Sequence, residues 1–108
     1  MNQQVKVIAL SGSFNASNAN EFQATIKEVI TNEISIVLVD CHALTFMDST
    51  GLGNLVLAFK TLRSSGIQMI ICSINEQIRI LFELTGMDSI FTIIPNQDEL
   101  KHLLVSVN

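Results

Sequence analysis

The sequence has few of the residues that are typical of disordered, fibrous or nucleic-acid-binding chains. Among 108 residues there are only one proline and five glycines, and charged residues make up 15%. With 48% hydrophobic residues the chain is too apolar to stay disordered, so we expect a single domain over residues 1–108. Six basic residues against ten acidic ones give a net charge of -4, the wrong sign for a phosphate-backbone binder. We therefore expect no nucleic acid partner.

Long hydrophobic runs and a secretory leader are also absent from the sequence. The longest unbroken apolar run is five residues, Leu55–Phe59, whereas a membrane span needs roughly 18. The polar start Met1–Gln4 lacks both the basic region and the apolar region of a signal peptide. We expect a cytoplasmic protein that does not cross or bind a membrane.

Cysteine is scarce, and its two occurrences do not form a metal-binding motif. Cys41 and Cys72 stand singly in apolar surroundings, with no C-x-x-C pair and no cluster of ligands at metal-binding spacing. We therefore expect two reduced, buried thiols.

We expect His42 and His102 to be ordinary surface or loop histidines. The sequence predicts no metal and no cofactor.

Short β-branched runs alternate with amphipathic stretches, which predicts a layered α/β domain. Four runs rich in Ile and Val predict strands at Val5–Leu10, Ile34–Val39, Ile67–Cys72 and Ile90–Ile94. Within the second run, Ile36–Val39 is continuously apolar, which indicates a central strand that is covered on both faces. Because a helix returns the chain between successive strands, we expect a mostly parallel sheet.

Four helices are predicted by apolar stripes at helical spacing. Their expected limits are Ala19–Asn32, Thr50–Ser64, Glu76–Thr85 and Gln97–Val107. Asn18, with Glu21 three residues later, offers a capping start to the first helix. The residues expected to face the core are Phe22, Ile26, Val29, Ile30, Leu52, Leu55, Val56, Phe59, Leu62, Ile78, Leu81, Phe82, Leu100, Leu103, Leu104 and Val107.

Polar and small residues gather at 44–53, where a strand should end and the second helix begin. In parallel α/β sheets, partners and ligands meet the carboxyl ends of strands, and a helix N-terminus favours an anion. Asp48, Ser49 and Thr50 could each cap the helix, so a capping role and a functional hydroxyl both stay open. No nucleotide-binding glycine motif occurs, and no base or third triad member accompanies Ser49. These absences disfavour nucleotide binding and serine hydrolysis.

Apolar residues flank this polar turn. We assign Phe46 to the core and Met47 to an interface, although the opposite assignment of each residue stays open. Leu57 falls about 140° from Leu52 around the helix, off the buried stripe. Leu57 therefore either packs laterally against a neighbouring helix or lies exposed on a face that a partner reaches.

A resemblance to a known family lies in the segment Phe46-Met47-Asp48-Ser49-Thr50-Gly51-Leu52-Gly53. It resembles the F-[ILM]-D-S-[ST]-G-[LI]-G signature of the STAS domain family, in the branch of bacterial anti-sigma factor antagonists. Gly12-Ser13-Phe14-Asn15, followed by Asn18-Ala19, is similar to the G-x-[LF]-D and helix start of that family. The segment 78–86 is similar to its V-x-[RK]-[LIV]-[LF]-x-[LIM]-[ST]-G segment. The resemblance covers about residues 4–106.

The fold that the resemblance implies is the STAS fold, a mostly parallel sheet of four to five strands with four helices. Relatives often begin with an extra edge strand. In this sequence only Met1–Gln4 remain to form such a fifth strand.

The function that the resemblance implies is a phosphorylation switch. In this branch the serine after the aspartate is phosphorylated by a partner anti-sigma factor, which is an ATP-dependent serine kinase. A metal-dependent serine phosphatase removes the phosphate. Ser49 would be the phosphoacceptor, and the unphosphorylated protein would bind the anti-sigma factor and release the sigma factor. We expect a monomer that is the kinase's substrate and has no catalytic activity of its own.

The same resemblance implies a set of partner-binding residues around Ser49. Thr50 would cap or shape the helix start, and Gly51 would let the kinase backbone come close. Asn15 stands where the family has an aspartate, which removes a negative charge that would face the phosphorylation site. The full set is Phe46, Met47, Asp48, Thr50, Gly51, Gly53 and Asn15.

Two other functions stay open at this point. A STAS scaffold or regulatory module in a transporter-linked or sensor assembly would bind a partner without being phosphorylated. A small-molecule or nucleotide-binding domain is favoured only by the general α/β architecture.

Overall fold

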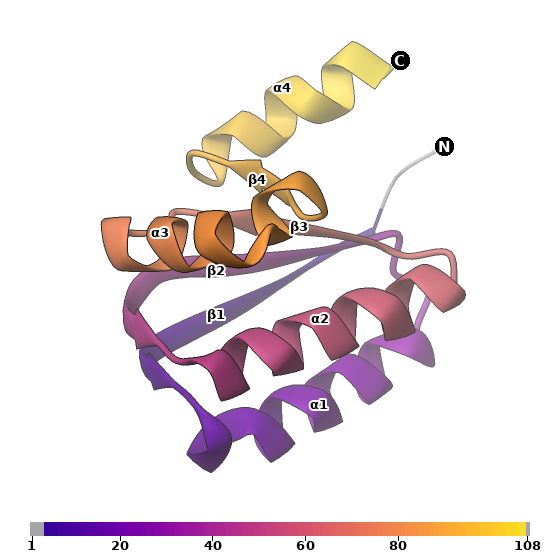
Figure 1. The fold of residues 1–108 in the computed structure, drawn as a ribbon. Coiled ribbons are helices and arrows are strands. Elements are labelled where there is room, and N and C mark those ends of the chain that lie inside the picture. Colours follow the sequence, from indigo (N-terminus) through magenta and orange to yellow (C-terminus); the bar gives the residue numbers. More distant parts are fainter. Residues whose placement is uncertain (1–3, 108) are drawn as a thin grey trace.

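The computed structural model describes residues 4–107, which form a four-stranded sheet and four α-helices (Figure 1). The elements in chain order are β1 (Val5–Phe14), α1 (Ala16–Ile30), β2 (Ile36–Met47), α2 (Ser49–Ser64), β3 (Gln68–Cys72), α3 (Glu76–Thr85), β4 (Thr92–Ile94) and α4 (Asp98–Val107). The strand order is β1-β2-β3-β4, and each neighbouring pair is parallel. The predicted fold class is confirmed. A fifth strand at Met1–Gln4, which the sequence left open, would rest on residues 1–3, which lie outside the described residues, and Gln4 is not part of a strand.

Side chains of the interior strands alternate between two hydrophobic layers, as the period of a strand requires. Val37 and Val39 of β2 pack in the layer that α1, α2 and α3 cover, whereas Ile36 and Leu38 pack in the layer under α4. Figure 1 shows α1 and α2 side by side on one face of the sheet and α4 on the other. The prediction of a central strand covered on both faces is therefore confirmed.

The helices bury the stripes that the sequence predicts. The stripe residues inside the two layers are Phe22, Ile26, Val29, Leu52, Leu55, Leu62, Ile78, Phe82 and Leu100. Those partly buried against them are Ile30, Val56, Phe59, Leu81, Leu103 and Leu104. The side chain of Val107, also predicted in a stripe, lies outside those that the structure describes. As predicted, Cys41 and Cys72 are free and buried, and His42 and His102 are exposed. Burial raises the pKa of the Cys41 thiol to about 12, so this thiol stays protonated at neutral pH.

The first helix begins at Ala16 and not at the predicted Ala19. Asn15 caps it, because its side-chain oxygen accepts a first-turn N–H at 2.9 Å. Asn18 completes the capping box by accepting the N–H of Asn15 at 3.0 Å. The predicted capping by Asn18 with Glu21 is therefore wrong, because Asn18 is the returning member of the box.

Strand lengths differ most from the prediction at the carboxyl ends of β1 and β2. β1 continues past the predicted Leu10 to Phe14, and β2 continues past Val39 to Met47. The two extensions pair with each other, with two register shifts, until Phe14 lies opposite Met47. Most residues of the two extensions are polar or small, so strand propensity alone does not predict them. They form strands because the two extensions pair with each other. These extensions carry the chain to the segment that resembles the STAS signature.

Candidate functional site

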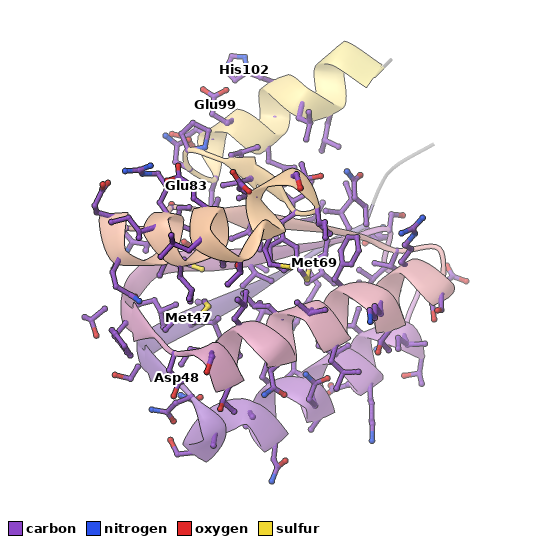
Figure 2. All side chains as sticks on the ribbon, viewed as in Figure 1. Met47, Asp48, Met69, Glu83, Glu99 and His102 are labelled. Atoms are coloured by element: carbon purple, nitrogen blue, oxygen red, sulfur yellow. The ribbon has the colours of Figure 1, made fainter. Side chains whose placement is uncertain are left out.

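A single residue, Asp48, joins the end of β2 to the start of α2 (Figure 2). Its backbone is extended, and its Oδ1 accepts the N–H of Gly51 at 2.8 Å. Asp48 is therefore the cap of α2, so Thr50 does not cap the helix, and the other role expected for Thr50, shaping the helix start, stays a prediction. Ser49 is exposed in the first turn, and its hydroxyl makes no hydrogen bond to any residue between 4 and 107.

The electrostatic surroundings of Ser49 can accept a negative charge but offer it little compensation. The first turn of α2 contains no acidic residue, and the N–H groups of a helix start favour an anion by about 0.3–1 kcal/mol. No lysine or arginine lies in the sequence between Lys27 and Lys60. The start of α2 would therefore be the partner of a phosphate on Ser49. The flanking segments offer this phosphate no basic side chain.

The two glycines of the signature have different environments. A β-carbon built on Gly51 would lie 2.2 Å from the carbonyl oxygen of Phe14, so this glycine is required by packing within the chain. That side of Gly51 faces Phe14, so packing explains the glycine without a kinase, and a contact of Gly51 with the kinase backbone stays a prediction. Gly53 is exposed, and a β-carbon built there has no atom within 4 Å. Gly53 is thus free to meet a partner.

Phe46 and Met47 have the reverse of the burial that we assigned. The side chain of Phe46 is 47% exposed, whereas that of Met47 is fully buried. The core assignment of Phe46 and the interface assignment of Met47 are both wrong, because strand alternation turns Met47 into the layer under α2 (Figure 2). The Met47 side chain cannot touch a partner in this structure, and Phe46 can.

Exposed residues follow one side of α2, and Phe46, also exposed, comes three residues before Ser49 in the chain. Ser49, Gly53 and Leu57 are spaced four residues apart, all three are exposed, and Leu57 keeps 51% of its surface. Of the two alternatives for Leu57, exposure is confirmed. We call this face the Ser49 surface and define it by Phe46, Ser49, Thr50, Gly53 and Leu57.

Asn15 lies at the same end of the sheet, because it follows Phe14, whose carbonyl meets Gly51. Its side-chain oxygen accepts from the backbone N–H of Ser17 at 2.9 Å and from the Ser17 hydroxyl at 2.6 Å. Asn15 therefore caps α1, which an aspartate at this position could do equally well. A role for Asn15 in partner binding stays a prediction.

Two residues that the sequence analysis did not single out hold the end of β2 from the side of α3. The Nδ2 group of Asn75 donates to the carbonyls of Leu44 and Thr45 at 3.2 and 3.1 Å. The side-chain amide of Gln77 forms two hydrogen bonds with the backbone of Met47. About 30 residues of chain separate the partners, so no local pattern could have predicted these contacts.

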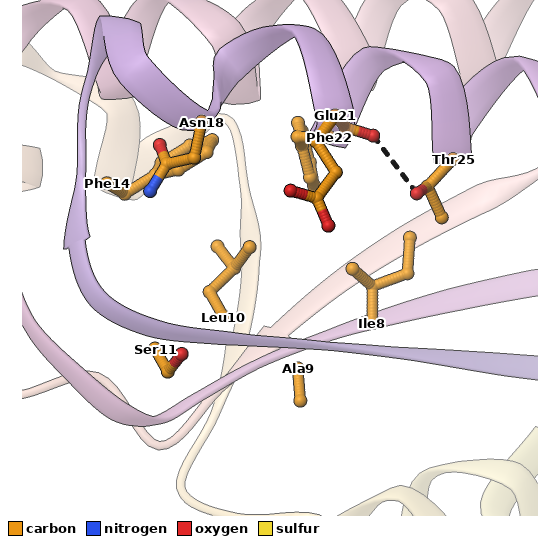
Figure 3. Close-up of a pocket in the computed structure, with 9 residues that line it drawn as sticks. All are labelled: Ile8, Ala9, Leu10, Ser11, Phe14, Asn18, Glu21, Phe22 and Thr25. Atoms are coloured by element: carbon orange, nitrogen blue, oxygen red, sulfur yellow. Dashed lines mark hydrogen bonds between the residues drawn. The ribbon is translucent and has the colours of Figure 1, made fainter.

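A pocket of about 240 Å³ lies between β1 and α1 (Figure 3). Ile8 and Leu10 point from β1 toward α1, while Ala9 and Ser11 point away. The lining holds one acidic side chain, Glu21, no basic one, and no residue of 46–53. This lining does not suit a nucleotide phosphate, because nothing in it offsets the charge.

The part of the chain that the structure describes forms neither a membrane-spanning helix nor a metal-binding cluster. Within residues 4–107 no helix is long and apolar enough to cross a bilayer. The same residues contain no group of three or more His, Cys, Asp or Glu side chains that could hold a metal ion.

Comparison with known proteins links this geometry to one family. The family model described as STAS domain matches residues 1–100. The anti-sigma-B factor antagonist of Listeria monocytogenes is 30% identical to this chain over 86 residues, which cover 80% of this chain and 75% of the relative. This identity extends over most of both chains, so the relationship does not depend on the eight-residue signature alone.

Solved structures share the fold at lower identity. SpoIIAA, an anti-sigma factor antagonist, is similar in its unphosphorylated form with a TM-score of 0.73 and 19% identity, covering 98% of this chain and 93% of that one. The phosphorylated form of SpoIIAA from Bacillus gives a TM-score of 0.72 and 18% identity, over 95% and 94% of the two chains. A sulfate transporter family protein from Wolinella succinogenes gives a TM-score of 0.82 and 15% identity, over 94% and 88%. At these identities the likeness shows the fold alone.

Proposed function

The chain belongs to the STAS domain family, and we propose that it is an anti-sigma factor antagonist whose partner binding is switched by phosphorylation of Ser49. The observation that carries the proposal is the position of Ser49, which is exposed in the first turn of α2 directly after its cap Asp48. Its hydroxyl is not used by the fold. The 30% identical antagonist of Listeria monocytogenes supports the regulatory role.

The unphosphorylated protein binds its partner through the Ser49 surface. Phe46 and Leu57 supply exposed apolar area before and after Ser49 in the chain, and Gly53 adds no side chain between Ser49 and Leu57. This combination suits a protein partner that covers the start of α2, because apolar anchors supply most of the binding energy at such interfaces.

Phosphorylation blocks this contact by charge. A phosphoserine carries about -1.5 to -2 charges at neutral pH. The helix end stabilises that charge in the free protein, so the fold is retained. In the complex the phosphate would lose its water beside Asp48 without gaining a basic partner from its own chain, and an uncompensated buried charge costs several kcal/mol.

The partners in this proposal are an anti-sigma factor that is a serine kinase and a metal-dependent serine phosphatase that resets Ser49. The protein itself is the substrate of both enzymes and acts as a monomer in the cytoplasm. Binding of the unphosphorylated form to the anti-sigma factor releases the sigma factor.

Mass spectrometry tests the proposal directly. The purified protein is incubated with ATP and the kinase-like anti-sigma factor encoded in the same genome, and peptide fragmentation locates the phosphate. We expect one phosphate on Ser49 in the wild type and in Thr50→Ala, and none in Ser49→Ala. Phosphate on Thr50, with Ser49 unmodified, would overturn the assignment.

The second candidate is a STAS scaffold that binds its partner without being phosphorylated. The fold shared with the sulfate transporter family protein of Wolinella succinogenes is compatible with this role but says nothing of the partner. A stable complex with the kinase-like protein, together with an unmodified Ser49 after prolonged incubation with ATP, would favour the scaffold over the switch.

A further inference from the structure

The last residues of β2 have a strand neighbour on one side only. β1 pairs with β2 as far as Met47, whereas β3 pairs with it only as far as Asp40, opposite Cys72. Past Asp40, the edge of β2 that faced β3 would therefore leave backbone groups without a strand partner. Such groups need other hydrogen-bond partners or water.

Side-chain amides at the start of α3 take the place of the missing strand. Asn75 caps α3 with its Oδ1, which accepts the N–H of Ile78 at 2.9 Å, and its Nδ2 donates to the carbonyls of Leu44 and Thr45. Gln77 then binds Met47 with both ends of its amide. α3 is thus attached to β2 along the stretch that leads to Ser49.

The Gln77 contact reproduces the two hydrogen bonds that a neighbouring strand would make. The N–H of Met47 donates to Gln77 Oε1 at 3.0 Å, and Gln77 Nε2 donates to the Met47 carbonyl at 2.9 Å. Met47 is also anchored by its fully buried side chain. Only Asp48 separates it from Ser49, so an orientation fixed at Met47 is passed to Ser49 with little freedom between them.

We propose that Gln77 is a positioning residue for Ser49, which it holds in the orientation that the kinase partner recognises by fixing the backbone of Met47. This inference rests on the proposed function of Ser49. Without the amide, the N–H and carbonyl of Met47 would bind water, and the junction at Asp48 would sample other orientations. Fewer molecules would then present Ser49 correctly at any moment.

The expected effect follows from the strength of the two hydrogen bonds. Water replaces part of what the two hydrogen bonds contribute, so their net loss should amount to about a tenfold change in an equilibrium, or about 1.4 kcal/mol. We therefore expect Gln77→Met, which keeps the length of the side chain and removes the amide, to loosen the junction about tenfold. Gln77→Glu can still accept the Met47 N–H, so it should keep most of the protection of that amide.

Gln97→Met is the matched control. Gln97 also holds β2 through a side-chain amide, which donates to Asp40 Oδ2 at 2.7 Å, but it does so far from the junction. Amide hydrogen exchange of the free protein, followed by NMR, should show the Met47 amide exchanging about tenfold faster in Gln77→Met than in the wild type and unchanged in Gln97→Met. The amides of Val37 and Val39 should be unchanged in all variants. Equal exchange at Met47 in the wild type and Gln77→Met would overturn the proposal.

Phosphorylation kinetics test the second half of the inference. With the kinase-like anti-sigma factor that modifies wild-type Ser49, kcat/KM should fall about tenfold for Gln77→Met and stay unchanged for Gln97→Met, both variants being folded at the assay temperature. Unchanged kinetics in Gln77→Met would show that Gln77 does not position Ser49 for the kinase. If the wild type itself is not modified, the proposed function fails, and hydrogen exchange still decides whether Gln77 fixes the junction.

Discussion

The start of α2 is in direct contact with the end of β1, through the α-carbon of Gly51 and the carbonyl oxygen of Phe14. A β-carbon on residue 51 would lie 2.2 Å from that oxygen, closer than any side chain can come. The same oxygen accepts the N–H of Asp48 at 3.4 Å. The turn that exposes Ser49 is therefore held by β1 on one side and by Gln77 of α3 on the other.

The two glycines of the signature should respond in opposite ways to the same added methyl group. Gly51→Ala should destabilise the fold by about 1–3 kcal/mol, because the new β-carbon overlaps Phe14 backbone that cannot move cheaply. Gly53→Ala should stabilise it by about 0.5–1 kcal/mol, because alanine favours a helix and the site is open. Urea unfolding of both variants measures the difference. Equal free energies of unfolding would contradict the packing role of Gly51.

Substitution of Met47 should lower the stability of the fold, whereas substitution of Phe46 should mainly weaken partner binding. Met47→Ala leaves a cavity in the layer under α2 and should cost about 2–5 kcal/mol of folding free energy. Phe46→Ala should cost about 1 kcal/mol or less, since half of the side chain is exposed. Titration of the anti-sigma factor partner should show about tenfold weaker binding for Phe46→Ala. Wild-type affinity in Phe46→Ala would remove Phe46 from the interface.

Much of the fold was predictable because its signals are local. Helix stripes such as Ile78 and Phe82 and the apolar run of β2 depend on burial with a fixed period, which the sequence displays directly. The position of Ser49 between a strand and a helix was predictable for the same reason. The eight-residue signature then identified the family, which periodicity alone could not do.

The details that the sequence did not reveal depend on contacts between distant segments. The burial of Met47 and the exposure of Phe46 follow from the register of β2 against β1, which shifts twice along the pair. The role of Gly51 follows from the approach of Phe14, and that of Gln77 from the early end of β3. None of these contacts can be read from the segment in which the residue lies.

Acid should destabilise the protein partly through Asp40. Burial opposes ionisation of this carboxyl, but hydrogen bonds from Gln97, the backbone of His42 and the thiol of Cys72 outweigh it and hold its pKa below the usual 3.8. Because the folded-state pKa is the lower one, the stabilisation is complete above about pH 4 and is lost as pH falls through the folded-state value. Urea unfolding at pH 7 and pH 3 should therefore show a smaller acid loss for Asp40→Asn than for the wild type. Equal losses would exclude Asp40 as a contributor.

The charge at Ser49 should control partner binding while the fold stays intact. Ser49→Ala removes an exposed hydroxyl that the fold does not use, and Asp48 remains the cap, so this variant should fold normally and bind the anti-sigma factor like the unphosphorylated protein. Ser49→Asp adds one negative charge, which the start of α2 tolerates in the free protein and which loses its water in the complex. We expect binding weaker by about tenfold for Ser49→Asp and by about a hundredfold, or 2.7 kcal/mol, for phosphorylated wild type.

Calorimetric titration measures the affinities, and circular dichroism of each free protein should be unchanged. Equal affinities of Ser49→Asp and Ser49→Ala, or a changed fold on phosphorylation, would show that a local electrostatic block is not the mechanism.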